Sequence, residues 1–214
     1  MRPRLLLYDW DNTLVDGWAG ITAALNAAFD AFALPRWSVR ETRERARVSM
    51  RESFPVLFGP EWQRAREIFL GALAERHLEH VRPMDGAQDL LIAGAACWRQ
   101  GLVSNKTGRF LRAEVRHLGW EHYFDSVIGA GDAHADKPDP APILLALERM
   151  GESARAEVWY LGDTASDMQA ARAAGVTGVL VGDASHDGGI ARAAPDMHFA
   201  SAHALAAHLR SLAS

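Results

Sequence analysis

The chain has a single cysteine, Cys97, among its 214 residues. One cysteine excludes a disulfide within the chain, and scarce cysteine is typical of proteins in the reducing cytoplasm. We therefore expect a cytoplasmic protein. Cys97 lies in an apolar stretch with a helical pattern, so we expect it to be a small core residue rather than a nucleophile.

Lysine is almost as scarce, because only Lys106 and Lys137 are lysines among 23 basic residues. A lysine that arginine has not replaced can be needed as a compact point charge. The alternative is chance in an arginine-rich composition. The neighbours of the two lysines have to decide between these interpretations.

Long apolar runs and a strong charge bias are also missing. The longest nearly apolar run, Leu90 to Trp98, is too short to span a bilayer, so no membrane partner is expected. The net charge of −4 gives no reason to expect a nucleic-acid partner. The first aspartate comes as early as Asp9, which argues against a secretory signal. No exposed apolar stripe stands out, so we expect a monomer or a weak homodimer.

Short apolar runs alternate with helical patterns over most of the chain, which predicts an α/β fold with a parallel sheet covered on both faces, a Rossmann-like core. The predicted strands are Leu5–Tyr8, Gly101–Ser104, Ser126–Ile128, Val158–Leu161, Gly178–Val181 and Met197–Phe199. The predicted helices of this part are Ala87–Trp98, Phe110–Leu118, Ala141–Met150, Met168–Ala174 and His203–Leu212.

One region interrupts the alternation, because residues 17–82 contain no convincing strand. We predict a helical insertion at 17–82, and a core formed by 1–16 together with 83–214. The insertion is predicted to contain three helices. One has an apolar face from Ile21 to Phe32, one covers Ser38–Phe54 and one covers Trp62–His80.

Three predicted strands end in polar clusters, "DWDNT", "SNKTG" and "GDTASD". In parallel sheets, ligands bind at the carboxyl ends of the strands. Asp9 and Asp11 repel each other unless something positive joins them, and Mg²⁺ is the common cation beside a phosphate. Asp163 and Asp167 are expected at the same edge. The alternative for Asp9 and Asp11 is a pair of surface carboxylates at a loop. The alternative for Asp167 is a favourable place at a helix N-terminus.

The other polar residues at this edge suit the binding of an anion. Ser104 and Asn105 offer a hydroxyl, an amide and backbone N–H groups that fit phosphate oxygens. Lys137, in the proline-stiffened loop "ADKPDPAP", suits neutralising an anion. Asn12 follows the first strand where a turn often needs a positive φ, which asparagine tolerates.

Together these motifs resemble those of the haloacid dehalogenase superfamily of phosphatases. "DWDNT" resembles the first motif, Asp-x-Asp-x-Thr, Ser104 the second, Lys137 the third and "GDTASD" the fourth. The order is that of the family, and the resemblance covers essentially the whole chain. Asn12 stands where glycine is commoner.

The resemblance implies a mechanism and a set of roles. Asp9 would be the nucleophile that forms an aspartyl-phosphate, and Asp11 would be the general acid and base. Mg²⁺ would be held by the Asp9 carboxylate, the Asp11 backbone carbonyl and Asp163, with Asp167 assisting directly or through a water. Ser104 and Lys137 would hold the phosphoryl oxygens.

Within the family, the chain most resembles phosphoglycolate-phosphatase-like members, on the length of the insertion, "VSNKTG" and "RPMDGAQDLL". The insertion would be a helical cap that closes over a small phosphorylated metabolite, with 2-phosphoglycolate the leading candidate. Lys106 would lie near the site or be a solvated loop lysine. Trp10 would line the pocket or pack beneath the cap.

Arg40, Arg43, Arg47 and Arg51 share one face of a predicted helix. That face would meet a second anionic group, with Arg51 or Arg47 as the binding residue, or it is a solvated face balanced by glutamates.

Several alternatives stay open. The substrate could be a sugar phosphate or a nucleoside monophosphate, and the reaction could be that of a sugar-phosphate mutase. A non-catalytic phosphoester-binding protein is the alternative from a different class. Asp11 and Asp163 argue against a dehalogenase. The lack of lysine in the insertion argues against a Schiff-base phosphonate hydrolase.

Overall fold

The computed structural model describes residues 2–46 and 50–213, and it divides the chain into two compact units. The first unit comprises Met1–Val15 and Pro83–Ser214, and the second comprises Asp16–Arg82. The first boundary, between Val15 and Asp16, lies one residue before the one expected from the sequence, and the second lies between Arg82 and Pro83, as expected. The chain leaves the first unit at β2 (Val15–Asp16) and returns at β3 (Arg82–Pro83), and these two short strands pair with each other.

The first unit is built on a parallel sheet, as the sequence predicted. In the described part of the chain this sheet has six strands in the order β5-β4-β1-β6-β7-β8. The strands are β1 (Leu5–Tyr8), β4 (Arg99–Thr107), β5 (Ser126–Ala130), β6 (Val158–Gly162), β7 (Thr177–Val181) and β8 (Met197–Phe199).

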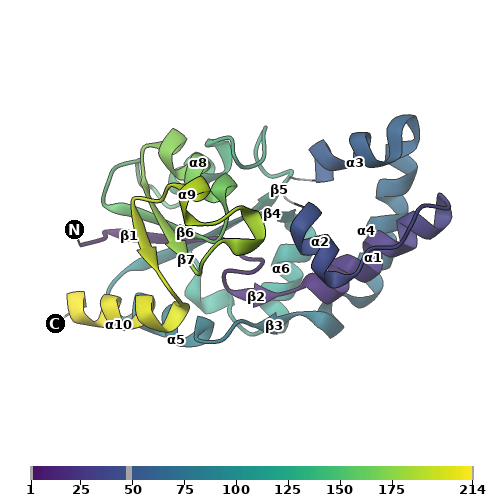
Figure 1. Ribbon diagram of the computed structural model, residues 1–214. Helices are drawn as coiled ribbons and strands as arrows, with labels where there is room; N and C mark the ends of the chain where they lie inside the picture. Colours follow the sequence, from purple (N-terminus) through teal and green to yellow (C-terminus); the bar gives the residue numbers. More distant parts are fainter. Residues whose placement is uncertain (1, 47–49, 214) are drawn as a thin grey trace. The chain divides into compact units, whose positions relative to one another are not determined.

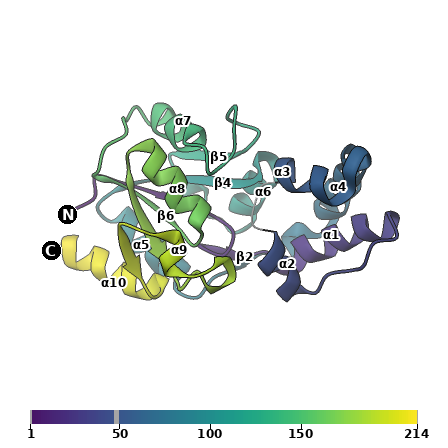
Figure 2. The same ribbon diagram turned by 45° about the horizontal axis from the view of Figure 1, so that its top comes forward.

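Helices cover both faces of this sheet, which makes the unit a three-layer, Rossmann-like core. The helices are α5 (Ala87–Ala95), α6 (Gly108–His117), α7 (Ala141–Arg149), α8 (Ala165–Ala174), α9 (Ile190–Ala193) and α10 (Ala202–Ala213), with short 3-10 turns at Glu121–Tyr123 and Ser185–Asp187. In Figures 1 and 2, α5 and α10 lie together on one side of the sheet and α8 lies on the other.

The central strand β1 explains why both faces need cover. All four of its residues, Leu5–Tyr8, are at most 1% exposed. Leu5 and Leu7 join a core cluster with residues of α7 and α8, whereas the Tyr8 hydroxyl on the other face donates to Gln100 Oε1 at 2.6 Å. An uninterrupted apolar run of this kind is what a doubly covered parallel strand requires.

Cys97 is exposed, so its expected place in the core is wrong. Helix α5 ends at Ala95, two residues before Cys97, and Trp98 is the buried residue of the turn that follows. The apolar residues therefore continue for three positions beyond the end of the helix.

The second unit is helical and has a core of its own. It comprises α1 (Trp18–Ala31), α2 (Val39–Arg45), α3 (Met50–Phe58), a 3-10 turn at Gly59–Glu61, and α4 (Trp62–His80). Aromatic rings dominate this core, with Phe29 against Trp37 and Phe58, and Phe54 against Phe69.

The predicted helix over Ser38–Phe54 is wrong in its middle. Ser38 begins α2 with a capping box to Glu41, but the helix ends at Arg45, where Ala46 takes a ψ of 62°. A new helix, α3, starts at Met50. Arg40 and Arg43 therefore lie on a different helix from Arg51, and Arg47 lies outside the described residues.

Among the residues that the structure describes, no helix combines the length and the apolar character needed to cross a bilayer.

Candidate active site

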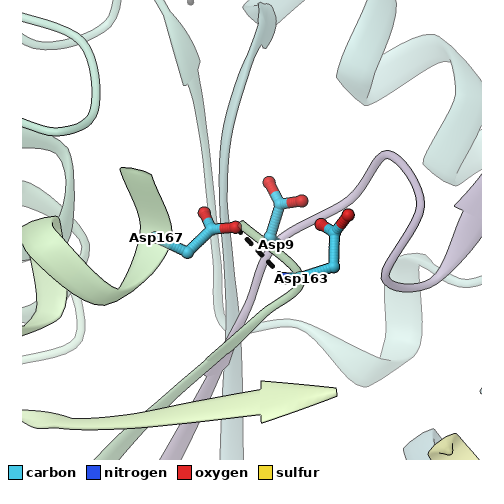
Figure 3. Close-up of side chains that lie close together, drawn as sticks. All are labelled: Asp9, Asp163 and Asp167. Carbon is cyan, nitrogen blue, oxygen red and sulfur yellow. Dashed lines mark hydrogen bonds between the residues drawn. The ribbon is translucent and has the colours of Figure 1, made fainter. Parts of the chain in front are cut away.

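Three neighbouring strands end at one edge of the sheet and bring the predicted polar residues together. Parallel pairing aligns Tyr8 at the end of β1 with Leu102 of β4 and Leu161 of β6. The residues that follow these positions, Asp9, Val103–Ser104 and Gly162–Asp163, are therefore neighbours in space. Figure 3 shows Asp9 and Asp163 rising from adjacent strand ends, with Asp167 reaching in from α8.

Asp9, Asp163 and Asp167 form a buried cluster of carboxylates. One oxygen from each of them lies within 4.8 Å of the others, and the three residues are 6%, 3% and 1% exposed. Like charges at this spacing repel each other in a medium where water cannot screen them. Oxygen ligands of this type suit a hard divalent cation.

Lys137 is the positive group inside this cluster. Its Nζ donates to Asp9 Oδ1 at 2.6 Å, to Asp167 Oδ1 at 2.7 Å and to the Tyr160 hydroxyl at 2.8 Å. The Tyr160 hydroxyl in turn donates to the backbone carbonyl of Val103 at 2.9 Å. Burial alone would lower the pKa of Lys137, but Asp167 and Asp9 hold it well above its usual value. Lys137 is therefore a permanent ammonium pointing at Asp9.

Asp9 has a strongly perturbed carboxyl. Burial raises the pKa of Asp9 to about 8, against the attraction of Lys137 and with a further rise from Asp167 and Asp163. One lysine thus does not balance the cluster, and a further positive charge is needed to keep Asp9 ionised at neutral pH.

Asp163 is held by donors from two other segments. Asn12 Nδ2 donates to its Oδ2 at 2.5 Å, and the Thr13 hydroxyl donates to its Oδ1 at 3.0 Å. Asn12 has a φ of 64°, which confirms the predicted left-handed turn after β1. His186 also approaches, with Nε2 lying 3.0 Å from Asp163 Oδ2. These contacts fix the direction of the Asp163 carboxylate.

Asp167 both caps helix α8 and belongs to the carboxylate cluster. It forms a capping box with Thr164 at the start of α8, and its Oδ2 accepts the backbone N–H groups of Thr164 at 3.0 Å and Asp163 at 3.2 Å. Burial would raise the pKa of Asp167, but Lys137 and the bonds from Thr164 hold it below its usual value. Gly162 makes room for this carboxylate, because a Cβ there would overlap it.

Asp11 stands apart from the cluster and has its own lysine. Lys106 Nζ donates to Asp11 Oδ1 at 2.7 Å, and the Asp11 side chain is 22% exposed while that of Lys106 is 4% exposed. Burial raises the pKa of Asp11, and Lys106 opposes this rise. Lys106 is therefore a buried partner of Asp11 and not a solvated loop lysine.

Ser104 and Asn105 lie where β4 departs from regular pairing with β5. The register shifts between Val103 and Thr107, which is a bulge-like irregularity of the kind common beside active sites. Ser104 is buried, and its Oγ accepts the backbone N–H of Lys106 at 3.2 Å. Asn105 exchanges two hydrogen bonds of 2.9 Å with the backbone of Lys137. Its amide thus fixes the loop that carries Lys137.

Trp10 is fully buried, with partners in the first unit. Its indole N–H donates to Glu114 Oε2 at 2.7 Å, and its ring meets Trp120 edge-on. These contacts give Trp10 a packing role beside Asp11. Arg51 belongs to the second unit, so its predicted contact with substrate stays a prediction.

Three residues beside the site had not been singled out from the sequence. Tyr160 lies within an apolar strand, where nothing distinguished its hydroxyl. His186 was one of nine scattered histidines. Glu114 did leave a signal, since it falls four residues after Phe110 and next to Val115 on the apolar face of a helix.

The comparison with known proteins agrees with this geometry. The model of the haloacid dehalogenase-like hydrolase family matches residues 6–181. A phosphoglycolate phosphatase of Xanthomonas campestris is 31% identical over 186 residues, covering 83% of this chain and 82% of the relative. An N-acetylmuramic acid 6-phosphate phosphatase of Pseudomonas aeruginosa is 30% identical over 183 residues, covering 82% of this chain and 80% of the relative.

A solved structure shows the same fold. A haloacid dehalogenase-like hydrolase of Streptococcus pneumoniae superposes with a TM-score of 0.85 at 19% identity, covering 96% of this chain and 98% of that one. The range matched by the family model, residues 6–181, includes Asp9, Ser104, Lys137 and Asp163. The chain therefore belongs to the haloacid dehalogenase-like hydrolase family and is a phosphatase of that family.

Proposed function

We propose that the protein hydrolyses a small phosphomonoester with the help of Mg²⁺, through a phosphoryl group carried on Asp9. The observation that carries the proposal is the pairing of each of the first two aspartates with a different buried lysine. Asp9 contacts Lys137 inside the carboxylate cluster, whereas Asp11 contacts Lys106 outside it. Two carboxylates in such different surroundings suit two different tasks.

In the first step, an oxygen of the Asp9 carboxylate attacks phosphorus, and the bond from phosphorus to the ester oxygen breaks. Asp11 gives its proton to the departing alkoxide, so that the alcohol leaves neutral. Lys137, held beside Asp9, neutralises charge on the phosphoryl oxygens during the transfer. The Ser104 hydroxyl and neighbouring backbone N–H groups would donate hydrogen bonds to the same oxygens.

In the second step, water replaces the enzyme carboxylate on phosphorus. Asp11, now ionised, takes the proton from the attacking water, and the acyl-phosphate bond breaks. This step returns Asp9 as a carboxylate, Asp11 as an acid and the phosphoryl group as inorganic phosphate. One residue thus acts as acid and then as base.

The residues present fit a divalent cation. The excess of buried negative charge around Asp9, Asp163 and Asp167 and the rise in the pKa of Asp9 both call for another positive charge. Asp9, Asp163 and the Asp11 backbone carbonyl would hold Mg²⁺, which supplies charge neutralisation for the phosphoryl oxygens. Asp167, which already bonds to Lys137 and to backbone N–H groups, would assist directly or through a bound water.

The leading substrate candidate is 2-phosphoglycolate, with sugar phosphates as the alternative. One relative is named for phosphoglycolate and another for N-acetylmuramic acid 6-phosphate. Both compounds join a phosphate ester to a carboxylate, so the substrate class we propose is a small phosphomonoester with a second anionic group. The helical unit, Asp16–Arg82, is proposed as the cap that selects it, with Arg51 as the candidate partner of the second anion.

The test is phosphate release from a panel of phosphomonoesters with and without a carboxylate. The panel includes 2-phosphoglycolate, N-acetylmuramic acid 6-phosphate, glucose 6-phosphate and adenosine monophosphate. Each is measured with Mg²⁺ and with EDTA. We expect turnover to need Mg²⁺ and to favour the carboxylated esters.

Two variants check the intermediate. Asp9→Asn should abolish turnover. Asp11→Asn, supplied with 4-nitrophenyl phosphate, whose leaving group needs no proton, should accumulate protein that carries one phosphoryl group, seen by mass spectrometry after acid quenching. Asp85→Asn is the matched control, because the Asp85 side chain is 96% exposed. Turnover by Asp9→Asn at the wild-type rate would refute Asp9 as nucleophile. Binding of the esters without any turnover would favour a binding protein.

A further inference from the structure

Glu114 is a buried acid with no role in the mechanism above. It lies in α6, on the face that also buries Phe110, Leu111 and Val115, and it is 1% exposed. A buried carboxylate of this kind destabilises a fold unless it is paired and hydrogen-bonded. Its partners therefore indicate why an acid stands at this place.

Trp10 and Lys106, two partners of Glu114, belong to the sheet edge that carries the site. Its Oε2 accepts the indole N–H of Trp10 at 2.7 Å and lies 2.8 Å from Lys106 Nζ. The same Nζ lies 2.7 Å from Asp11 Oδ1. Glu114, Lys106 and Asp11 thus form a continuous chain of short contacts that ends on the proposed general acid.

The local fold around β4 directs Lys106 into this chain. The register with β5 shifts between Val103 and Thr107, so Ser104, Asn105 and Lys106 lie in the irregular segment. Asn105 is used to hold the backbone of Lys137, while Lys106 carries its ammonium to Asp11. The Lys106 ammonium has three donors on a flexible stem, and Glu114 limits the positions that this stem can take.

We infer that Glu114 is a positioning residue for acid–base catalysis, acting through Lys106 to hold the Asp11 carboxyl group in the orientation needed for proton transfer. Lys106 holds Oδ1 of Asp11, which leaves Oδ2 to carry the proton toward the leaving oxygen. Trp10 steadies the same Glu114 oxygen from the other side. The inference rests on the proposed function, because it needs Asp11 to be the acid.

A positioning role predicts a dependence on the leaving group that a structural role does not. An alkyl phosphate such as 2-phosphoglycolate needs a proton on its leaving oxygen, whereas 4-nitrophenyl phosphate releases a stable phenolate without one. The ratio kcat/KM reports the steps up to the first irreversible one, which is transfer of the phosphoryl group to Asp9. The later use of Asp11 as a base does not enter this ratio.

The experiment compares kcat/KM for these two substrates in the wild type, Glu114→Gln, and the double variant Glu114→Gln with Lys106→Met. Proton transfer by a positioned group contributes about 100-fold or more to such reactions. We expect a loss of about 10- to 100-fold for the alkyl ester and less than about 3-fold for 4-nitrophenyl phosphate. The double variant removes one positive and one negative charge together, which keeps the buried charge balanced.

Two further variants separate positioning from stability. Trp10→Phe removes the indole donor to Glu114 and keeps the contact between Glu114 and Lys106, so it should cause a loss for the alkyl ester that is selective but smaller than that of Glu114→Gln. Glu148→Gln is the matched control on α7, because Glu148 is exposed. Thermal unfolding of each variant reports any loss of fold.

The outcomes are distinct. An equal loss for both substrates, or no loss for either, in a folded Glu114→Gln protein would overturn the positioning role while the phosphatase proposal stands. If the wild type turned over neither substrate with Mg²⁺ present, the proposed function would fail first and the inference with it. A selective loss for the alkyl ester in both Glu114 variants is the result that supports the inference.

Discussion

Replacing Asp9 by asparagine should stabilise the metal-free protein while abolishing its activity. Asp9 is 6% exposed, and one of its carboxylate oxygens lies within 4.8 Å of oxygens from Asp163 and Asp167. Burial and these neighbours raise its pKa from 3.8 to about 8. Folding therefore favours the protonated carboxyl, and asparagine reproduces that neutral form with nearly the same shape.

The pKa fixes the sign and the size of the effect. Because the folded-state pKa lies above the unfolded one, the favourable contribution of Asp9 is complete below about pH 4 and is lost as the pH rises toward 8. At pH 7 the loss covers the interval from 3.8 to 7, which at about 1.4 kcal/mol for each pH unit is about 4 kcal/mol. Asp9→Asn should recover most of this amount at pH 7 and almost none at pH 4.

The assay is urea or thermal unfolding in EDTA at pH 4, 5.5, 7 and 8.5. For a chain of this size, a gain of a few kcal/mol corresponds to a rise of about 5–15 °C in Tm. Asp85→Asn, an exposed change of the same kind, should stay within about 0.5 kcal/mol of the wild type. Adding Mg²⁺ should stabilise the wild type more than Asp9→Asn, because the variant has lost a ligand. A variant no more stable than the wild type at any pH would refute the reasoning.

Three other substitutions test the cluster. Lys137→Met should lower kcat by about 100-fold or more, because it leaves Asp9 and Asp167 without their ammonium partner. The Tm measured in EDTA should fall as well. A variant with the wild-type kcat would contradict the role given to these contacts. Asn105→Ala should lower kcat by about 10-fold through loss of both hydrogen bonds to the Lys137 loop, which steady-state kinetics would show. Gly162→Ala should weaken Mg²⁺ binding measured by calorimetry, because its Cβ would displace the Asp167 carboxylate; unchanged affinity would argue against this close approach.

The sequence predicted best those elements whose pattern has one explanation. The strand Leu5–Tyr8 and the helix Trp62–His80 were predicted with the bounds that the structure shows. A run of apolar residues bounded by an aspartate, and a long proline-free segment that follows the turn at Gly59-Pro60, leave little choice. The second predicted strand, Gly101–Ser104, was too short at both ends, because Arg99–Gln100 before it and the polar residues Asn105–Thr107 after it also belong to β4.

Other features depend on tertiary contacts that no local pattern contains. The sequence did not predict the break between α2 and α3, because the residues around Ala46 include neither glycine nor proline. Trp10 could be placed beside the site but not against Glu114, since 104 residues separate the two partners in the chain. The apolar neighbours of Glu114 on α6 could have suggested that this acid is buried. Its contact with Lys106 could not be predicted, because it depends on how α6 packs against β4.

The scarcity of lysine turns out to be the most informative compositional feature. Both lysines of the chain are buried at one sheet edge, with side chains 4% exposed, and each bonds to one of the two aspartates of "DWD". Arginines that form ion pairs, such as Arg36, Arg99 and Arg112, lie largely at the surface. A guanidinium is broader and planar, so it would not fit a point contact shared by two or three oxygens.

The same two lysines also define what the site lacks on its own. Five acids, Asp9, Asp11, Glu114, Asp163 and Asp167, surround two ammonium groups in the described part of the chain. A phosphate ester would add still more negative charge to this edge. Lys106 is shared by two carboxylates, whereas Lys137 lies in a cluster of three, so the larger deficit of positive charge lies in the cluster around Lys137. The division of labour between the aspartates follows from that balance: the cation-deficient cluster suits transfer of a phosphoryl group, and the lysine-held Asp11 suits transfer of a proton.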